Sequence, residues 1–414
     1  MRPGREENWI PAFAGMTDEC MFKIQTLNNI SLLGLERLPR DRYEVASSLA
    51  SPDAVLVRSA DMHKLDIPKS VKAIGRAGAG TNNIPVKAMS ERGVPVFNAP
   101  GANANAVKEL VLAGMLIAAR NLIPAWSFTQ TLSGDDAVLH QAVEEGKKKF
   151  VGFELPGRTL GVIGLGAIGV KVANAALDLG MRVLGYDPAI TVQNAWQLNA
   201  SVQQAVSVDD LIARADVITV HVPLIDATRH LINAARIKLM KQGATVLNFA
   251  REGVVDEPAV RAGLDQGKLH AYVCDFPTLA LYRHPRVVSL PHLGASTGEA
   301  EDNCAVMVAE QLRDFLENGN IRNSVNFPEA VMPKVAGATR LCIANANVPN
   351  MVGQITTALA QHNLNIADLL NKSRGGIAYT LVDVDGAIPA AVCAEISSIQ
   401  GVLSIRALGG NGAR

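Results

Sequence analysis

Residues 159–187 read TLGVIGLGAIGVKVANAALDLGMRVLGYD and contain the most informative pattern of the chain. A short apolar run leads into a G-x-G-x-x-G arrangement, a helical pattern follows, and a second apolar run ends in an acidic residue. An acidic residue about 20 residues beyond the glycines is the context in which this motif binds a dinucleotide. The stretch therefore predicts a strand, a phosphate-binding turn, a helix and a second parallel strand.

The glycine-rich turn runs from Gly164 to Gly169, and each of its glycines meets a different structural requirement. Gly164 makes the tight turn, Gly166 lets the backbone approach a pyrophosphate, and Gly169 allows close helix packing. Ala167 and Ile168 lie at the start of the predicted helix, where backbone amides can hold phosphates. A glycine-rich turn without a ligand is the alternative interpretation.

The acidic residue that closes the second strand is Asp187. Its carboxylate can accept hydrogen bonds from the ribose hydroxyls of an adenosine. Its charge would repel the 2′-phosphate of NADP, and no arginine follows it closely in the sequence to neutralise that phosphate. The cofactor that this loop predicts is therefore NAD.

The same unit of apolar run, turn and helical pattern recurs along the chain, which predicts parallel sheets in α/β domains. A long helical pattern at 104–120 separates two series of such units, and a second one at 299–318 follows the last unit. The runs are DAVLVRS, VKAIGRAGAG, GVPVFNAP, TLGVIGLG, MRVLGYD, ADVITVHVP and ATVLNFA.

The predicted fold is two Rossmann-like doubly wound α/β lobes, the first interrupted by the second, followed by a small domain. Residues 21–103 and 296–327 form the predicted substrate-binding lobe, and residues 104–295 form the predicted NAD-binding domain. From residue 338 to 414 the order becomes strand, helix, strand, strand, helix, strand. That order is typical of an α+β domain of the ferredoxin-like type.

The composition of the 414-residue chain excludes several classes of protein. With 48% hydrophobic residues, 19% charged residues and zero formal net charge, neither disorder nor a nucleic-acid partner is expected. Five scattered cysteines without C-x-x-C pairing predict a reducing cytosol and neither a disulfide framework nor a metal site. The longest apolar stretch, Leu110 to Ala119, is about half the length of a membrane-spanning helix and predicts a buried helix instead.

The first 20 residues have neither helical nor strand periodicity, and they lack the features of a signal peptide. We expect this leader to be poorly ordered. Met21 opens the first domain-like segment, so a start of translation at Met21 is the alternative to a natural leader.

Two residues at the ends of predicted strands have side chains that suit acid–base and electrostatic catalysis. Arg251, in NFAREGVVDE, follows a strand and can hold a carboxylate through two parallel hydrogen bonds. His292, in SLPHLGAST, precedes the second long helix, and the ordinary pKa of histidine suits proton transfer near neutrality. The alternatives are an arginine in a surface ion pair and a histidine with a structural role only.

Together these motifs resemble the D-2-hydroxyacid dehydrogenase family over about 300 residues. The resemblance implies that Arg251 binds the substrate carboxylate, that His292 donates and accepts the proton, and that Asp275 hydrogen-bonds the nicotinamide carboxamide. It also implies cofactor contacts at His221, Pro223, Ala250 and Gly294. The matching segments are Gly164 to Gly169 with Asp187, HVPL at 221–224, NFAREGVVD at 248–256 and PHLGAST at 291–297.

Three further segments are similar to the family members that oxidise 3-phospho-D-glycerate at the start of L-serine synthesis. By this resemblance Arg58, Ser59, Arg76 and Asn103 bind the substrate, whose phosphate requires cations beyond Arg251. Solvated loop arginines are the alternative for Arg58 and Arg76. Oxidation of another 2-hydroxy acid, such as 2-hydroxyglutarate, and NAD sensing without turnover are the alternative functions. The segments are GAGTNNI at 78–84, FNAPGANANAVKEL at 97–110 and GNIRNSVNFPE at 319–329.

The chain departs from the family pattern at the carboxylate that pairs with the catalytic histidine. The expected glutamate position holds Leu279 or Ala280 in CDFPTLALYRHP. Either another group steadies His292, or its imidazole works with a lower pKa, or the protein is catalytically weak. Of these, we expect the lower pKa and a shifted pH optimum.

The segment from about Thr339 resembles an ACT domain, a module that pairs edge to edge with another copy and binds amino acids between chains. The resemblance implies an L-serine site at Asn345, Asn347 and Asn365, whose amides can serve both a carboxylate and an ammonium. The acidic and histidine residues usual around the first of these asparagines are missing. A purely structural pairing module is therefore the alternative, and a homo-oligomer, dimer or tetramer, is expected in either case.

Overall fold

The computed structural model describes residues 21–409, so the predicted leader at 1–20 lies outside the described residues. Internal contacts divide the chain into two units. Unit 1 takes the residues up to Ala99 and those from Cys304 onward, and unit 2 takes Pro100–Asn303. The predicted boundaries at 103/104 and 295/296 lie near this division, the predicted boundary at 338 has no counterpart in it, and all three stay predictions. Within the described residues, no helix is both long and apolar enough to cross a membrane.

Unit 2 contains a seven-stranded sheet in the order β12-β11-β10-β9-β6-β7-β8, with every pair parallel. The strands predicted from TLGVIGLG, MRVLGYD, ADVITVHVP and ATVLNFA are confirmed as β6, β7, β9 and β10. The strand bounds are β6 Thr159–Ile163, β7 Arg182–Tyr186, β8 Gln203–Gln204, β9 Val217–Val220, β10 Ala244–Asn248, β11 Leu269–Cys274 and β12 Val287–Ser289.

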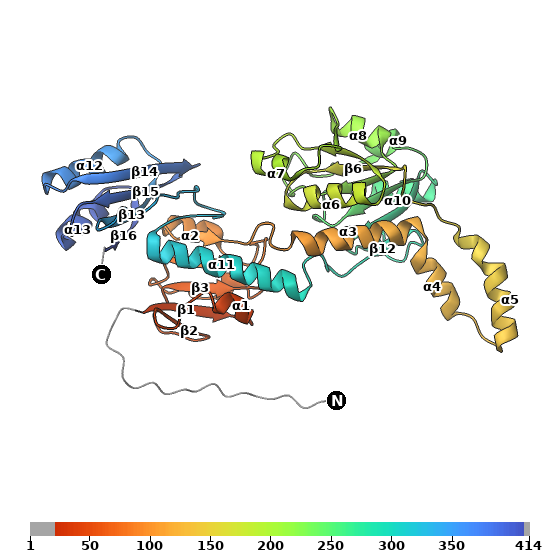
Figure 1. Cartoon of the computed structure of the whole chain (residues 1–414), viewed down its shortest axis with the longest axis horizontal. Coiled ribbons are helices and arrows are strands. Elements are labelled where there is room, and N and C mark those ends of the chain that lie inside the picture. The colour runs from red at the N-terminus through yellow and green to blue at the C-terminus, as the bar shows by residue number, and fades with distance from the viewer. Residues whose placement is uncertain (1–20, 410–414) are drawn as a thin grey trace. The chain divides into compact units, whose positions relative to one another are not determined.

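Helices cover both faces of this sheet (Figure 1). Buried side chains of α3 and α6 pack with β6 and β7 in one core cluster, whereas those of α8, α9 and α10 belong to a second cluster. The predicted apolar helix is α3, although its Leu116 is 42% exposed. The helices are α3 Ala104–Ala119, α4 Leu122–Gln130, α5 Asp136–Gly146, the 3₁₀ turn η2 Lys147–Phe150, α6 Ala167–Asp178, α7 Val192–Gln197, α8 Val208–Arg214, α9 Ala234–Leu239 and α10 Glu257–Asp265.

Unit 1 begins with a five-stranded parallel sheet in the order β2-β1-β3-β4-β5. Helix α11 packs closely on it, since a Cβ added at Gly75 of β4 would overlap Val308 of that helix. The division between the units falls within α11. The elements are β1 Phe22–Leu27, α1 Leu32–Leu35, β2 Tyr43–Ala46, β3 Ala54–Val57, the 3₁₀ turn η1 Met62–Lys64, β4 Ala73–Arg76, α2 Val86–Glu91, β5 Val96–Phe97 and α11 Gly298–Asn318.

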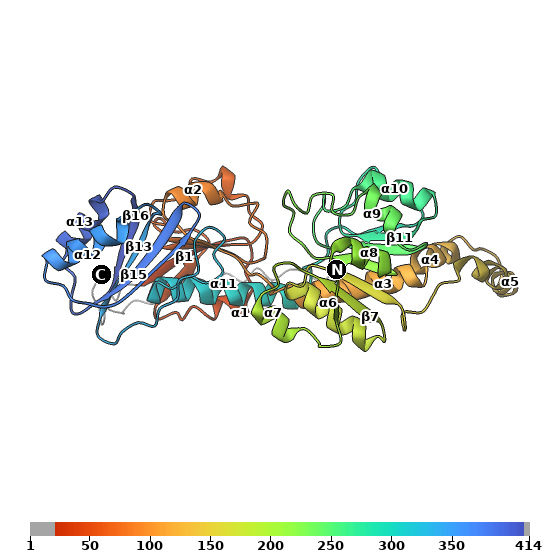
Figure 2. The ribbon, with the colours of Figure 1, turned by 90° about the horizontal axis from the view of Figure 1, so that it is seen from above.

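The C-terminal part of unit 1 has the predicted order of strand, helix, strand, strand, helix, strand, and its sheet is antiparallel (Figure 2). The sheet order is β14-β15-β13-β16, and side chains of both helices belong to its core. The predicted fold class, parallel α/β sheets followed by a small α+β part, is therefore confirmed. The elements are β13 Thr339–Ala346, α12 Met351–Gln361, β14 Ile366–Arg374, β15 Ile377–Val384, α13 Ala390–Ser398 and β16 Val402–Leu408.

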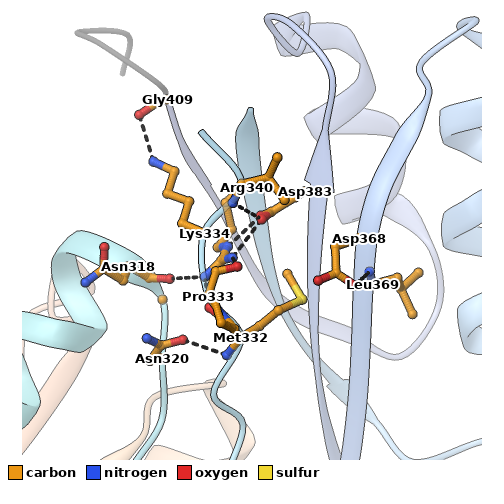
Figure 3. A network of polar contacts seen from close by, with 12 residues as sticks. Asn318, Asn320, Met332, Pro333, Lys334, Arg340, Asp368, Leu369, Asp383 and Gly409 are labelled. Carbon is orange, nitrogen blue, oxygen red and sulfur yellow. Dashed lines mark hydrogen bonds and ion pairs between the residues drawn. The ribbon is translucent and has the colours of Figure 1, made fainter. Parts of the chain in front are cut away.

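A buried ion pair holds this small sheet to the segment before it (Figure 3). Both side chains, Arg340 of β13 and Asp383 of β15, are 0% exposed. The guanidinium donates to the carboxylate from Nε at 2.6 Å and from Nη2 at 2.7 Å. It also donates to the carbonyl oxygens of Asn318, Met332 and Pro333. One arginine therefore joins the end of α11 and the following linker to the sheet.

Replacing Asp383 with Asn should lower the free energy of unfolding by roughly 3–5 kcal/mol, because it leaves the buried guanidinium of Arg340 without its counter-charge. The matched control is Glu44→Gln, which removes the exposed ion pair with Lys23 at 3.8 Å and should cost at most about 1 kcal/mol. Urea unfolding of both variants measures the difference. Equal losses in the two variants would contradict a central role for the buried pair.

Candidate functional site

The candidate cofactor and catalytic residues lie in loops that follow six neighbouring strands of the unit 2 sheet. The strand order reverses between β6 and β9, and ligands of open α/β sheets bind beyond the carboxyl ends of the strands at such a point. The loop after β6 carries the glycines, and the loop after β9 carries His221. The parallel sheet therefore gathers segments that the sequence separates.

The glycine-rich loop has the geometry that its sequence predicts. Gly164 has φ +93°, and a Cβ there would lie 2.5 Å from the carbonyl oxygen of His221. A Cβ at Gly169 would overlap the carbonyl oxygen of Gly164, whereas a Cβ at Gly166 would meet nothing within 4 Å. Helix α6 begins after Gly166 without a side-chain cap, so its first amides remain for a phosphate. Open space at Gly166 and uncapped amides together fit a pyrophosphate.

Asp187 directly follows β7, and its carboxylate holds this loop in place. Its carboxylate accepts hydrogen bonds from the amides of Leu165 at 2.8 Å and Ala189 at 2.9 Å. The residue also borders a cavity of about 220 Å³ with mostly apolar walls, which suit a flat heterocycle such as adenine. The cavity is lined by Leu165, Gly185, Asp187, Ile190, Leu198, Val202, Gln203 and Gln204.

His221 presents an unpartnered polar atom beside the glycine loop. Its Nε2 lies 3.0 Å from the hydroxyl of Thr219, while its Nδ1 is buried without a hydrogen-bond partner among the described residues. Burial lowers the pKa of His221 from 6.5 to about 4, so the imidazole is neutral at pH 7. A buried polar atom without a partner is costly in a folded protein, and a cofactor group could satisfy it. Pro223, two residues further, is exposed.

The catalytic candidate Arg251 is exposed, and a buried amide holds its backbone. Asn248, 1% exposed, donates from Nδ2 to the carbonyl oxygen of Arg251 at 3.0 Å and accepts the amide of Ala250 at 3.2 Å. The guanidinium donates to the carbonyl oxygen of Ala250 at 2.7 Å. Asn248 was not predicted from the sequence, where its signal was an amide residue at the end of a mostly apolar strand.

The segment that carries His292 is held by Asp275, which is 1% exposed. The carboxylate accepts the amides of Leu293 at 2.8 Å and Gly294 at 2.7 Å, and the carbonyl oxygen of Asp275 accepts the amide of His292 at 3.2 Å. His292 itself has φ +57°, a conformation that non-glycine residues seldom adopt. The structure therefore shows Asp275 shaping the histidine loop, and its predicted contact with a nicotinamide stays a prediction.

The loop at the missing glutamate position offers the histidine no carboxylate. Leu279 is 94% exposed and Ala280 is exposed as well. Across residues 21–409, the imidazole of His292 has no hydrogen-bond or ion-pair partner. Its ring instead packs in a T-shaped arrangement against Phe276, with 5.1 Å between the ring centroids and 61° between the planes. The expected shift of the pH optimum stays a prediction.

The predicted phosphate ligands belong to unit 1 and lie where two adjacent strands end. Arg58 follows β3 and Arg76 ends β4, and Nε of Arg76 donates to the carbonyl oxygen of Arg58 at 3.1 Å. The side-chain oxygen of Asn28 accepts the amides of Ser59 at 3.0 Å and of Ala60 at 2.7 Å. Asn28, a second residue that the sequence reasoning missed, fixes this turn.

Asn103 lies in unit 2 directly before α3, and its side chain does not cap that helix. A Cβ added at the nearby Gly101 would lie 3.0 Å from Cβ of Ala167, the first residue of α6. The loop of Asn103 is therefore next to the glycine loop.

Among residues 21–409, no group of three or more His, Cys, Asp and Glu side chains is placed to hold a metal ion.

The three predicted effector asparagines lie at two ends of the C-terminal sheet. Asn345 is 1% exposed, and its side chain bonds Thr380 and the carbonyl oxygen of Ala346. Asn347 is exposed beside the turn between β14 and β15. Asn365 is exposed beyond the opposite end of β15, with Nδ2 donating to Asp385 at 2.6 Å. A single chain does not bring all three together.

Comparison with known proteins agrees with this geometry. Residues 112–294 match the family described as D-isomer specific 2-hydroxyacid dehydrogenase, NAD binding domain. D-3-phosphoglycerate dehydrogenase of Methanocaldococcus jannaschii is 35% identical over 341 residues, which cover 80% of this chain and 61% of that protein. The Haemophilus influenzae protein of the same name is 34% identical over 352 residues, or 82% of each chain. The chain therefore spans less than two thirds of the first relative and about four fifths of the second.

Solved structures give the same picture. NAD⁺-bound 3-phosphoglycerate dehydrogenase of Entamoeba histolytica is similar with a TM-score of 0.57 and 26% identity. The match covers 74% of this chain and 99% of that one.

Lowering the pH should reduce the free energy of unfolding, because His221 is protonated more readily in the unfolded chain than in the folded protein. Because the folded-state pKa is about 4 and the unfolded value is 6.5, only the unfolded chain binds this proton between those pH values. The stability from the neutral imidazole is therefore complete above pH 6.5 and is lost as the pH falls toward 4, by about 3 kcal/mol in all.

We expect His221→Gln to remove this loss, so that its unfolding free energy falls less steeply than that of the parent between pH 6.5 and 4. Urea unfolding of both proteins at several pH values measures the two slopes. Parallel slopes would show that His221 does not carry the effect.

Proposed function

The chain belongs to the D-isomer specific 2-hydroxyacid dehydrogenase family, and from that premise we propose that it oxidises 3-phospho-D-glycerate to 3-phosphohydroxypyruvate with NAD. This reaction is the first step of L-serine biosynthesis. The observation that carries the proposal is the placement of Arg251 and His292 beyond the carboxyl ends of β10 and β12, in the sheet whose switch point holds the glycine loop. The names of both sequence relatives support the choice of substrate.

The residues around the switch point suit NAD. Uncapped amides at the start of α6 would hold the pyrophosphate, and the cavity beside Asp187 would take the adenosine. The unpartnered Nδ1 of His221 and the backbone near Pro223, Ala250 and Gly294 are proposed contacts of the remaining part. Asp187 carries the negative charge that disfavours a 2′-phosphate, which supports NAD over NADP.

In the proposed reaction, Arg251 binds the carboxylate of the hydroxy acid through its guanidinium and polarises the adjacent C2–O bond. His292 accepts the proton of the C2 hydroxyl as the C2–O double bond forms. NAD held by the glycine loop would supply the acceptor for the hydride that leaves C2. Asn248 and Asp275 contribute by holding the backbones of these two residues.

The phosphate of the substrate requires positive charge beyond Arg251. Arg58 and Arg76, on neighbouring strands and joined by a hydrogen bond, remain the proposed phosphate ligands, with Ser59 beside them. Asn103 is the proposed polar contact on the cofactor side, because its loop adjoins the start of α6.

A homo-oligomer is proposed from the apolar surface of α4 and α5. Neither helix buries a large apolar side chain within the chain, and such a helix gains little stability alone. A second copy of the same chain would cover these residues, and a single-chain mass in sedimentation equilibrium would contradict this. The exposed side chains are Leu122, Ile123, Trp126, Val138 and Val143.

L-serine is proposed as an effector bound between two copies of the C-terminal sheet. Strand β14 is an edge of that sheet, and two-fold pairing through this edge would run antiparallel. Such pairing would bring Asn365 of one copy toward the end that carries Asn347 in the other, which a single chain cannot do.

A cytosolic location is also proposed, supported by the free thiols of Cys274, Cys304, Cys342 and Cys393.

Purified protein should reduce NAD, but not NADP, in the presence of 3-phospho-D-glycerate. His292→Asn should lower kcat by about 10²–10⁴-fold, because the proton acceptor is lost, while NADH binding by fluorescence persists. The matched control is His230→Asn, since His230 is also exposed and left-handed, with φ +50° against +57°. No turnover in the parent protein, with NADH still bound, would overturn the proposed substrate and direct assays to other 2-hydroxy acids.

Titration calorimetry with L-serine should show heat with the parent protein and none with Asn347→Ala. Turnover should fall at millimolar L-serine in the parent protein only. D-serine is the control ligand, because it presents the same groups with the opposite hand. An absence of heat together with unchanged turnover would leave the C-terminal part as a pairing module.

A further inference from the structure

The catalytic histidine poses a problem of orientation. His292 is exposed, its loop lacks the expected glutamate, and no polar partner fixes its imidazole within residues 21–409. Asp275 holds the backbone of this loop but leaves the side-chain torsions free. Proton transfer is sensitive to the placement of the accepting nitrogen, so an imidazole that samples several rotamers would transfer protons inefficiently.

We propose that Phe276 is a positioning residue that orients the imidazole of His292 in place of the absent carboxylate. This inference rests on the proposed function. The rings are 5.1 Å apart between centroids with 61° between their planes. That edge-to-face arrangement is a favoured geometry of ring pairs. It limits rotation of the imidazole, whose nitrogens make no hydrogen bond within residues 21–409 and so remain available for proton transfer.

Phe276 is itself well fixed. It follows the buried pair Cys274 and Asp275, and its carbonyl oxygen accepts the thiol of Cys274 at 3.4 Å. It precedes Pro277, whose ring restricts the backbone of the residue before it to extended conformations. The phenyl ring is therefore attached to a backbone that has little freedom of its own.

The loop after Pro277 is held by one face of α10. Glu257, Arg261 and Asp265 follow one another at intervals of four residues, which places them on the same side of the helix. Glu257 accepts the hydroxyl of Thr278, Arg261 donates to the carbonyl oxygen of Ala280 at 2.9 Å, and Asp265 lies 3.2 Å from His284. These three contacts fix the loop that has lost the glutamate. The loop thus stays in place, and Phe276 at its beginning packs its ring against the imidazole of His292.

The test compares Phe276→Leu, which removes the aromatic ring, with Phe276→Tyr, which retains it. Phe276→Leu should lower kcat roughly two- to tenfold, the range that corresponds to the energy of an edge-to-face pair, with KM nearly unchanged. Phe276→Tyr should retain the parent kcat. The matched control is Phe153→Leu, because Phe153 forms the same T-shaped pair with His270, at 5.5 Å and 67°, away from the catalytic residues. This control should leave kcat unchanged.

A second readout does not depend on turnover. The ring current of Phe276 should displace the imidazole proton resonances of His292, assigned by their loss in His292→Asn, and Phe276→Leu should abolish the displacement. Unchanged resonances or an unchanged kcat in Phe276→Leu would overturn the inference. A parent protein without turnover would instead refute the proposed substrate, and the resonances would still decide whether the rings are in contact.

Discussion

Parallel pairing of the seven strands in unit 2 is the constraint on which the candidate site depends. Because all of these strands point the same way, every loop after a strand opens at one edge of the sheet, and the chain must cross back to start the next strand. The turn from β6 into α6 is tight because Gly169 lacks a Cβ, which would overlap the carbonyl oxygen of Gly164, and Gly164 in turn lies against the carbonyl oxygen of His221 after β9. The other functional loops then lie around the reversal of strand order between β6 and β9.

A common arrangement recurs in these loops. A polar side chain at or just after a strand end bonds the backbone of a functional loop, as Asp187 does for the glycine loop, Asn248 for Arg251 and Asp275 for the segment after His292. The bracing side chains of Asn248 and Asp275 are buried and bonded, so their polar groups cost little. Arg251 and His292 are exposed and avoid the cost of burying a charge. The residues that hold the loops rigid are therefore different from the exposed residues proposed to contact the substrate.

The same separation appears in the C-terminal part of unit 1. Arg340 and Asp383 are fully buried and link the end of α11 to the sheet, whereas Asn347 and Asn365 stay at the surface. The buried pair makes the position of the sheet depend on the backbone around Asn318 and Met332. The sheet is therefore firmly attached to the end of α11 and to the linker that follows it.

The glycine loop, the strand before Asp187, the two long helices and the order of elements in the C-terminal part could all be predicted from the amino-acid sequence. Those features depend on local backbone conformation and on the spacing of apolar residues, which a sequence displays directly. The folded chain was needed to see that Asn248 holds Arg251, that Asp275 holds the loop of His292 and that Phe276 packs on the imidazole ring of His292. Asp275 and Leu293 are 18 residues apart, and their contact depends on β11 pairing with β12. The order of strands in a sheet follows from the packing of the whole chain, and no local pattern records it.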